Sequence, residues 1–173
     1  IVAFQTLLKE LNQLGVEWLQ IEEPALVLDQ TEEEKNLFVS IYEGLLKNKN
    51  NLKILLQTYF GDVRDSLIKL DFDGIGLDFI EGRDSLALIQ KYGFPKEKIL
   101  FAGLVNGKNI WRNNYQKTLE LLTALDEVAD IVINTSCSLQ HVPVTVKNET
   151  KLSKEILKHF SFATEKLNEI DEI

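Results

Sequence analysis

The sequence contains no methionine, one cysteine and two histidines among 173 residues. A single cysteine cannot form a disulfide within the chain, which favours a reducing compartment and predicts a cytoplasmic location. Basic residues are outnumbered by acidic ones, 19 to 27, and the formal net charge is -8. This balance argues against a nucleic-acid or membrane partner, because both need clustered Lys and Arg. A chain without methionine that begins "IVAF" is also expected to be a fragment.

Long apolar runs are missing as well. The longest, such as "ILFAGLV", are far shorter than the ~20 residues that a membrane-spanning helix needs. No signal peptide is recognisable at the start of the chain. The length and the 45% hydrophobic content fit one globular unit, so we expect residues 1–173 to form a single α/β domain.

Apolar runs alternate with segments of helical periodicity along the whole chain. Strands are expected at residues 16–21, 52–60, 74–80, 98–105 and 130–136. Helices are expected at residues 4–14, 62–70 and 115–125. Another is expected to begin at a capping box formed by Thr31 and Glu34, and a further one to include Leu86. The stripe from Leu152 to Ile170 predicts one long closing helix.

The strands are near-continuous apolar runs, which is typical of parallel strands buried on both faces. Five such strands with intervening helices fit either an open doubly wound sheet or part of a (β/α)8 barrel. No glycine-rich phosphate loop follows the first strand, and polar residues follow all five strands instead of gathering at one switch point. The sequence therefore favours a partial (β/α)8 TIM barrel.

Four of the polar residues near strand ends are candidates for substrate binding, although each also has a structural interpretation. Glu22 and Glu23 are adjacent, so only one of them can point into a barrel mouth. Asp78 follows an apolar run, where a carboxylate is costly unless it is paired. Asn106 begins an Asn-Gly turn, and Lys108 beyond it is either an anion ligand or a solvated loop residue.

Cys137 and His141 raise the question of a metal site or a nucleophile. Zinc needs three or four ligands, and Cys137 has no CxxC partner in the sequence. A catalytic thiol needs a nearby base, which His141 supplies only if the loop folds back. His159 is expected on the far side of the barrel from the strand ends. We therefore expect Cys137 to be a packed cysteine.

Several segments resemble the amino-terminal domain of the cobalamin-independent methionine synthases, also called 5-methyltetrahydropteroyltriglutamate–homocysteine methyltransferases. The resemblance is carried in order by "LGVEWLQIEEPALV", "TYFGD", "GLDFIEG", "LFAGLVNGKNIWR" and "SCSLQHVPV". It implies two (β/α)8 barrels, of which this chain is about strands four to eight of the first. It also implies that zinc and homocysteine are bound by the carboxy-terminal barrel of the same chain. The resemblance further implies that the amino-terminal barrel helps to bind the folate polyglutamate.

The resemblance also bears on the candidate residues. Asp78 and Cys137 match two zinc-ligand positions of the other barrel, whereas "QTYFGD", on the strand before Asp78, lacks the His and Cys expected there. They are therefore vestigial positions, with no metal and no catalytic residue expected in this chain. Glu22 and Glu23 match the segment that handles the homocysteine amine. The implied role is structural and substrate-supporting. Two alternatives are a stand-alone uroporphyrinogen decarboxylase-like enzyme and a non-catalytic binding module.

Overall fold

The computed structural model describes residues 2–63 and 70–173, so most of the expected helix at 62–70 lies outside the described residues. Within these ranges, five parallel strands form one sheet in the order β1-β2-β3-β4-β5. Their bounds are β1 Trp18–Glu22, β2 Lys53–Gln57, β3 Gly74–Asp78, β4 Ile99–Val105 and β5 Asp130–Thr135. All five lie within a residue or two of the expected positions or inside them. The spatial order follows the chain order without the reversal that defines a doubly wound sheet.

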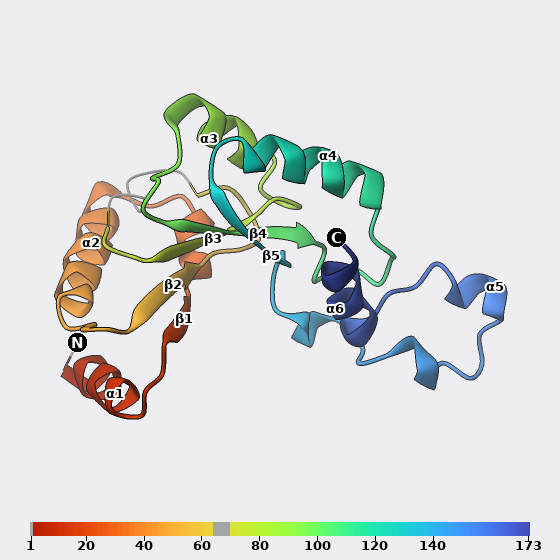
Figure 1. The fold of residues 1–173 in the computed structure, drawn as a ribbon, viewed down its shortest axis with the longest axis horizontal. Coiled ribbons are helices and arrows are strands. Elements are labelled where there is room, and N and C mark those ends of the chain that lie inside the picture. The colour runs from red at the N-terminus through yellow and green to blue at the C-terminus, as the bar shows by residue number, and fades with distance from the viewer. Residues whose placement is uncertain (1, 64–69) are drawn as a thin grey trace.

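The helices are α1 (Val2–Gln13), α2 (Glu32–Leu46), α3 (Ser85–Tyr92), α4 (Tyr115–Asp126), α5 (Lys154–Leu157) and α6 (Ala163–Glu172). Short 3-10 turns occupy Pro24–Val27, Leu139–His141 and Val146–Asn148. The predicted capping box begins α2: Thr31 N–H donates to Glu34 Oε2 (2.8 Å) and Glu34 N–H donates to the Thr31 hydroxyl (3.3 Å). Figure 1 shows α2, α3 and α4 along one side of the sheet, with α5 and α6 beyond the arrowhead of β4.

The side chains of the strands divide into two faces with different surroundings. One face packs with helix residues such as Tyr42 and Leu125 in the main apolar core; its strand members are Ile54, Leu56, Ile75, Leu77, Leu100, Ala102 and Leu104. The opposite face carries Trp18 on β1 and Phe101 on β4. Among the described residues, helices α1 to α4 all contribute to the core on the first face, through Leu8, Tyr42, Ile89 and Leu125. This is the arrangement of a barrel wall, whereas a doubly wound sheet has helices on both faces.

The second face is concave. The rings of Trp18 and Phe101 touch edge to face with centroids 5.6 Å apart, although two strands separate β1 from β4. In a flat sheet these strands would lie about 14 Å apart. Gly74 makes room for this contact, because a Cβ there would lie 2.7 Å from the Phe101 ring. The curvature is consistent with part of a barrel.

The prediction of one long closing helix is wrong. The chain forms the one-turn helix α5, leaves helical geometry at residues 158–162, and resumes as α6. Two backbone hydrogen bonds divert it: Arg112 N–H donates to the His159 carbonyl (3.0 Å) and Ser161 N–H donates to the Ile110 carbonyl (2.8 Å). Phe160 packs edge to face against Trp111 in this short antiparallel bridge. Tertiary pairing therefore overrides the helical periodicity of this segment.

No helix in the described residues has the length and apolar character needed to cross a membrane.

Candidate functional site

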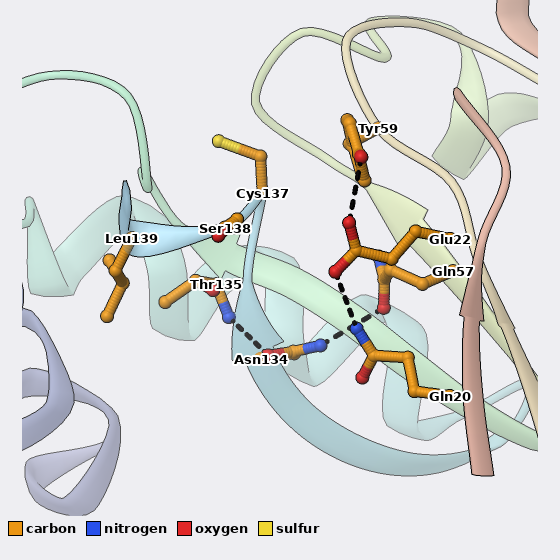
Figure 2. A pocket seen from close by; sticks show the side chains of 9 residues that line it. All are labelled: Gln20, Glu22, Gln57, Tyr59, Asn134, Thr135, Cys137, Ser138 and Leu139. Atoms are coloured by element: carbon orange, nitrogen blue, oxygen red, sulfur yellow. Dashed lines mark hydrogen bonds between the residues drawn. The ribbon is translucent and has the colours of Figure 1, made fainter. Parts of the chain in front are cut away.

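A pocket of about 250 Å³ opens at the carboxyl ends of the strands, on the concave side of the sheet. It is formed by side chains of β1, β2 and β5 and of the segments that follow β2 and β5 (Figure 2). The lining residues are Gln20, Glu22, Gln57, Tyr59, Asn134, Thr135, Cys137, Ser138 and Leu139. Parallel strands bring their carboxyl ends to one edge, and this explains why residues so distant in sequence meet here.

The two adjacent glutamates face different surroundings, as side-chain alternation requires. Glu22 lies in the pocket, where it accepts hydrogen bonds from the Tyr59 hydroxyl (2.9 Å) and the Gln20 amide (3.3 Å). Glu23 instead accepts a hydrogen bond from the Tyr42 hydroxyl (3.3 Å), which ties it to α2. Burial, together with the bond to Glu22, raises the pKa of Tyr59 to about 12, so Tyr59 is a neutral donor to this carboxylate.

The floor of the pocket contains carboxamides that the sequence interpretation missed. Asn134 on β5 donates to Gln57 Oε1 on β2 (3.1 Å), across two intervening strands (Figure 2). Gln57 is 3% exposed and also donates to the Thr58 carbonyl (2.9 Å). Gly76 lies beneath, and a Cβ there would sit 2.1 Å from Gln57 Oε1. The sequence did contain one signal for Gln20. Side chains alternate along a strand, so Gln20 must lie on the same face as Trp18 and Glu22.

Asp78, at the end of β3, organises the loops around it. Its Oδ1 accepts from the N–H groups of Ile80 (2.8 Å) and Glu81 (2.9 Å), and its Oδ2 accepts from Phe60 N–H (2.9 Å). Burial raises the pKa of Asp78 above its ordinary value, while the three backbone donors act in the opposite direction. Phe60 has a φ of 74°, a strained conformation for a bulky residue that this bond helps to hold. Both carboxylate oxygens are therefore used within the fold.

Cys137 is packed beneath the Asn-Gly turn. It is 2% exposed, and a Cβ at Gly107 would lie 2.4 Å from its carbonyl oxygen and 3.1 Å from its Sγ. Gly107 N–H donates to the Ser136 hydroxyl (3.1 Å) on the same segment. Burial raises the pKa of the Cys137 thiol, so it is protonated at neutral pH and a poor nucleophile. In Figure 2 its sulfur points away from Glu22 and Tyr59.

Asp78 and Cys137 do not belong to a cluster that fits a zinc ion. Nowhere in residues 2–63 and 70–173 do three or more His, Cys, Asp or Glu side chains come together in a way that could hold a metal. His141 packs edge to face on Phe60, with centroids 5.6 Å apart. The placement of His159 on the far side is wrong: its backbone pairs with Arg112, which follows β4, because the closing helix is interrupted there.

Asn106 and Lys108 are engaged within their own loop. The Asn106 side-chain oxygen accepts from the N–H groups of Lys108 and Asn109, both at 2.9 Å, and so closes the turn. The Lys108 ammonium pairs with Glu81 (3.0 Å) and lies 4.9 Å from the centre of the Phe60 ring. This lysine therefore links two rim loops.

Comparisons with known proteins show which family this chain resembles. A family model described as "Cobalamin-independent synthase, N-terminal domain" matches residues 1–130. A Lactococcus lactis subsp. lactis protein named 5-methyltetrahydropteroyltriglutamate–homocysteine methyltransferase is 94% identical over 176 residues, which cover 100% of this chain. Proteins of the same name from Lactococcus lactis subsp. cremoris and Campylobacter jejuni are 72% and 53% identical over 99% of the chain. The chain spans 23% of the length of each of these relatives.

The family model covers β1 to β4 and the turn over Cys137, and the first of these relatives matches the whole chain, β5 included. The resemblance seen in the sequence is thus confirmed by the family model and by relatives that match throughout the chain. The chain therefore belongs to the family of the amino-terminal domain of the cobalamin-independent synthases.

Proposed function

We propose that this chain is part of a methyltransferase that moves the methyl group of 5-methyltetrahydropteroyltriglutamate to homocysteine, forming methionine. The proposal is supported by the shared name of relatives up to 94% identical along the chain. Residues 1–173 would form one α/β domain, comprising about strands four to eight of the amino-terminal barrel. The in-order parallel sheet and its concave inner face support this placement.

The role proposed for this stretch is structural and substrate-supporting. The observation that carries it is the use of Asp78: both carboxylate oxygens accept backbone N–H bonds, so this side chain holds the loops that follow β2 and β3. The zinc of the whole protein would be held by its carboxy-terminal barrel, where it lowers the pKa of the substrate thiol. No step of the reaction is assigned to Asp78 or Cys137.

Glu22 is the residue of this chain best placed to meet a substrate. It is exposed in the pocket, it is negatively charged, and Tyr59 and Gln20 fix its two oxygens. A carboxylate with a neutral tyrosine beside it favours an ammonium group and disfavours the anionic polyglutamate tail. We therefore assign Glu22 to orienting the ammonium group of homocysteine, whose thiol would be held at the zinc of the facing carboxy-terminal barrel. The folate tail would bind to residues outside this pocket.

The test is methionine formation by the intact polypeptide from homocysteine and the methylated triglutamate. Glu22→Gln should raise KM for homocysteine by about 10-fold, as expected for losing a hydrogen bond to a charged group. Glu23→Gln is the matched control, and it should leave KM unchanged because Glu23 faces Tyr42. Failure of the intact polypeptide to form methionine would refute the reaction. An equal KM in both variants would refute the role of Glu22 alone.

A further inference from the structure

Helix α6 carries two charged side chains that are almost completely buried. Lys166 is 1% exposed and Glu169 is 5% exposed. Both face the segment 106–113 that follows β4, which we call the rim loop. The Lys166 ammonium donates to the Trp111 carbonyl (3.1 Å) and to the Asn109 side-chain oxygen (3.3 Å). Lysine and glutamate are almost never fully buried unless they are paired, so their presence here needs an explanation.

Glu169 holds the other end of the rim loop. Its Oε1 accepts a hydrogen bond from Asn113 N–H (3.0 Å). Burial lowers the pKa of Lys166, and the neighbouring charge of Glu169 counteracts this effect. The two residues are three positions apart on α6, which places them on one face of the helix. The helix thus presents an acceptor and a donor to loop atoms two to four residues apart.

Stability alone does not account for this junction. Among the described residues, the buried atoms without a hydrogen-bond partner are Glu169 Oε2, Asn113 Nδ2 and Ser161 Oγ, all in the contact between residues 113 and 161–169 or beside it. Each such atom costs stability, and buried charged groups can often be replaced by apolar residues without loss. Charged groups with directional bonds instead fix one relative position of two elements, because a shifted position leaves the charges unsatisfied.

The rim loop needs such a fixed position. At its start, Gly107 fits against the Cys137 backbone with no room for a side chain. Lys108 reaches Glu81 and Phe60 on other rim segments. A small displacement of this loop would therefore separate Lys108 from Glu81 and change the rim beside the pocket.

We propose that Lys166 and Glu169 are positioning residues that clamp the rim loop to α6, so that the position of α6 sets the position of Lys108 at the rim. The clamp acts through Trp111, Asn109 and Asn113, and neither charged residue touches the pocket. Movement of α6 is transmitted to the rim loop through these bonds. This inference is independent of methyl transfer, because its test reads loop position and not activity.

The experiment is amide hydrogen exchange followed by mass spectrometry on the intact polypeptide. Lys166→Met keeps the length of the side chain and removes the ammonium. Exchange in the rim loop should accelerate about 10- to 100-fold, as expected for losing hydrogen bonds to a charged group. Lys158→Met is the matched control, since Lys158 is an exposed lysine at the end of α5 whose ammonium pairs with Glu155. It should leave rim-loop exchange unchanged.

A second variant keeps the test decisive if Lys166→Met folds poorly. The double variant K166M/E169Q removes both buried charges together, which is less damaging than leaving one unpaired. Rim-loop exchange should still accelerate in it while β3 and β4 exchange as in the parent, and Lys166→Arg should restore slow exchange. The fluorine resonance of 5-fluorotryptophan at position 111 should shift in both charge-removing variants. Rim-loop exchange within about twofold of the parent, or equal acceleration in β3 and β4, would overturn the proposal.

Discussion

Gly76→Ala should loosen the inner face of the sheet by displacing Gln57. A Cβ at position 76 would lie 2.1 Å from Gln57 Oε1, 2.4 Å from its Cδ and 2.7 Å from its Nε2. Such distances are impossible without movement, so the carboxamide must leave its position. Its hydrogen bonds to Asn134 and to the Thr58 carbonyl are then broken.

The expected magnitude follows from two contributions. Overpacking of a buried position costs about 1–3 kcal/mol. Leaving a buried carboxamide partner unsatisfied costs about 1–3 kcal/mol more. We expect the free energy of opening the β2–β3 region to fall by about 2–6 kcal/mol. Native-state hydrogen exchange of the β2 and β3 amides in the intact polypeptide measures this quantity directly.

A double-mutant cycle isolates the cause. Gln57→Ala removes the obstructing atoms, so the double variant G76A/Q57A should be less destabilised than the sum of the single variants by about 1–3 kcal/mol. Gln20→Ala is the matched control, because Gln20 lies on the same face and is not among the nearest neighbours of Gly76. Its effect should add to that of Gly76→Ala. Additivity with Gln57→Ala as well would refute the packing described for this face.

Three further predictions concern the thiol, the acid range and the edges of the sheet. Cys137 should react with a disulfide reagent at pH 8 about 100-fold more slowly than a free thiol, because it is buried and protonated; equal rates would contradict its packed position. Burial acts to raise the pKa of Glu165, but hydrogen bonds from Thr145, Val146 and Phe162 outweigh it and hold the pKa below 4.5. Glu165 therefore contributes stability above pH 4.5 that is lost on acidification, and Glu165→Gln should flatten the dependence of the free energy of unfolding on pH as the pH falls below 4.5. The free energy of unfolding would be measured by urea titration at each pH. The same dependence on pH in the parent and the variant would contradict this role of Glu165. The 173-residue polypeptide alone should self-associate in light scattering, since β1 and β5 are sheet edges and the first turns of the chain expose Val2, Phe4 and Leu14; a monodisperse monomer would show that these surfaces are tolerated.

Much of the fold could be predicted from the sequence because its central strands β2, β3 and β4 are buried at most positions. Continuous apolar runs such as 99–105 have few alternatives to a parallel strand, and the Thr31 capping box marks a helix start locally. The prediction for the closing segment was wrong because a tertiary contact, and not the local pattern, decides its structure. Its apolar spacing fits a helix, but Phe160 and Ser161 pair with residues 110–111, a contact that no local pattern reveals.

The candidate site could be predicted only in outline. Residue type and strand ends pointed to Glu22, Glu23, Asp78 and Asn106, and the structure places all four near the carboxyl ends of the strands. The sequence could not show that Glu23 turns to α2 or that Asn106 closes its own turn. The bond between Gln57 and Asn134 depends on sheet curvature, which is a property of several strands together.

The most direct test of the structural role assigned to the lone thiol is the zinc content of the intact polypeptide. Parent and Cys137→Ser proteins would be compared by elemental analysis at equal protein concentration. Because Cys137 packs beneath Gly107 with its thiol protonated, both proteins should contain the same number of zinc ions per chain. Loss of one zinc ion per chain in Cys137→Ser would contradict the account.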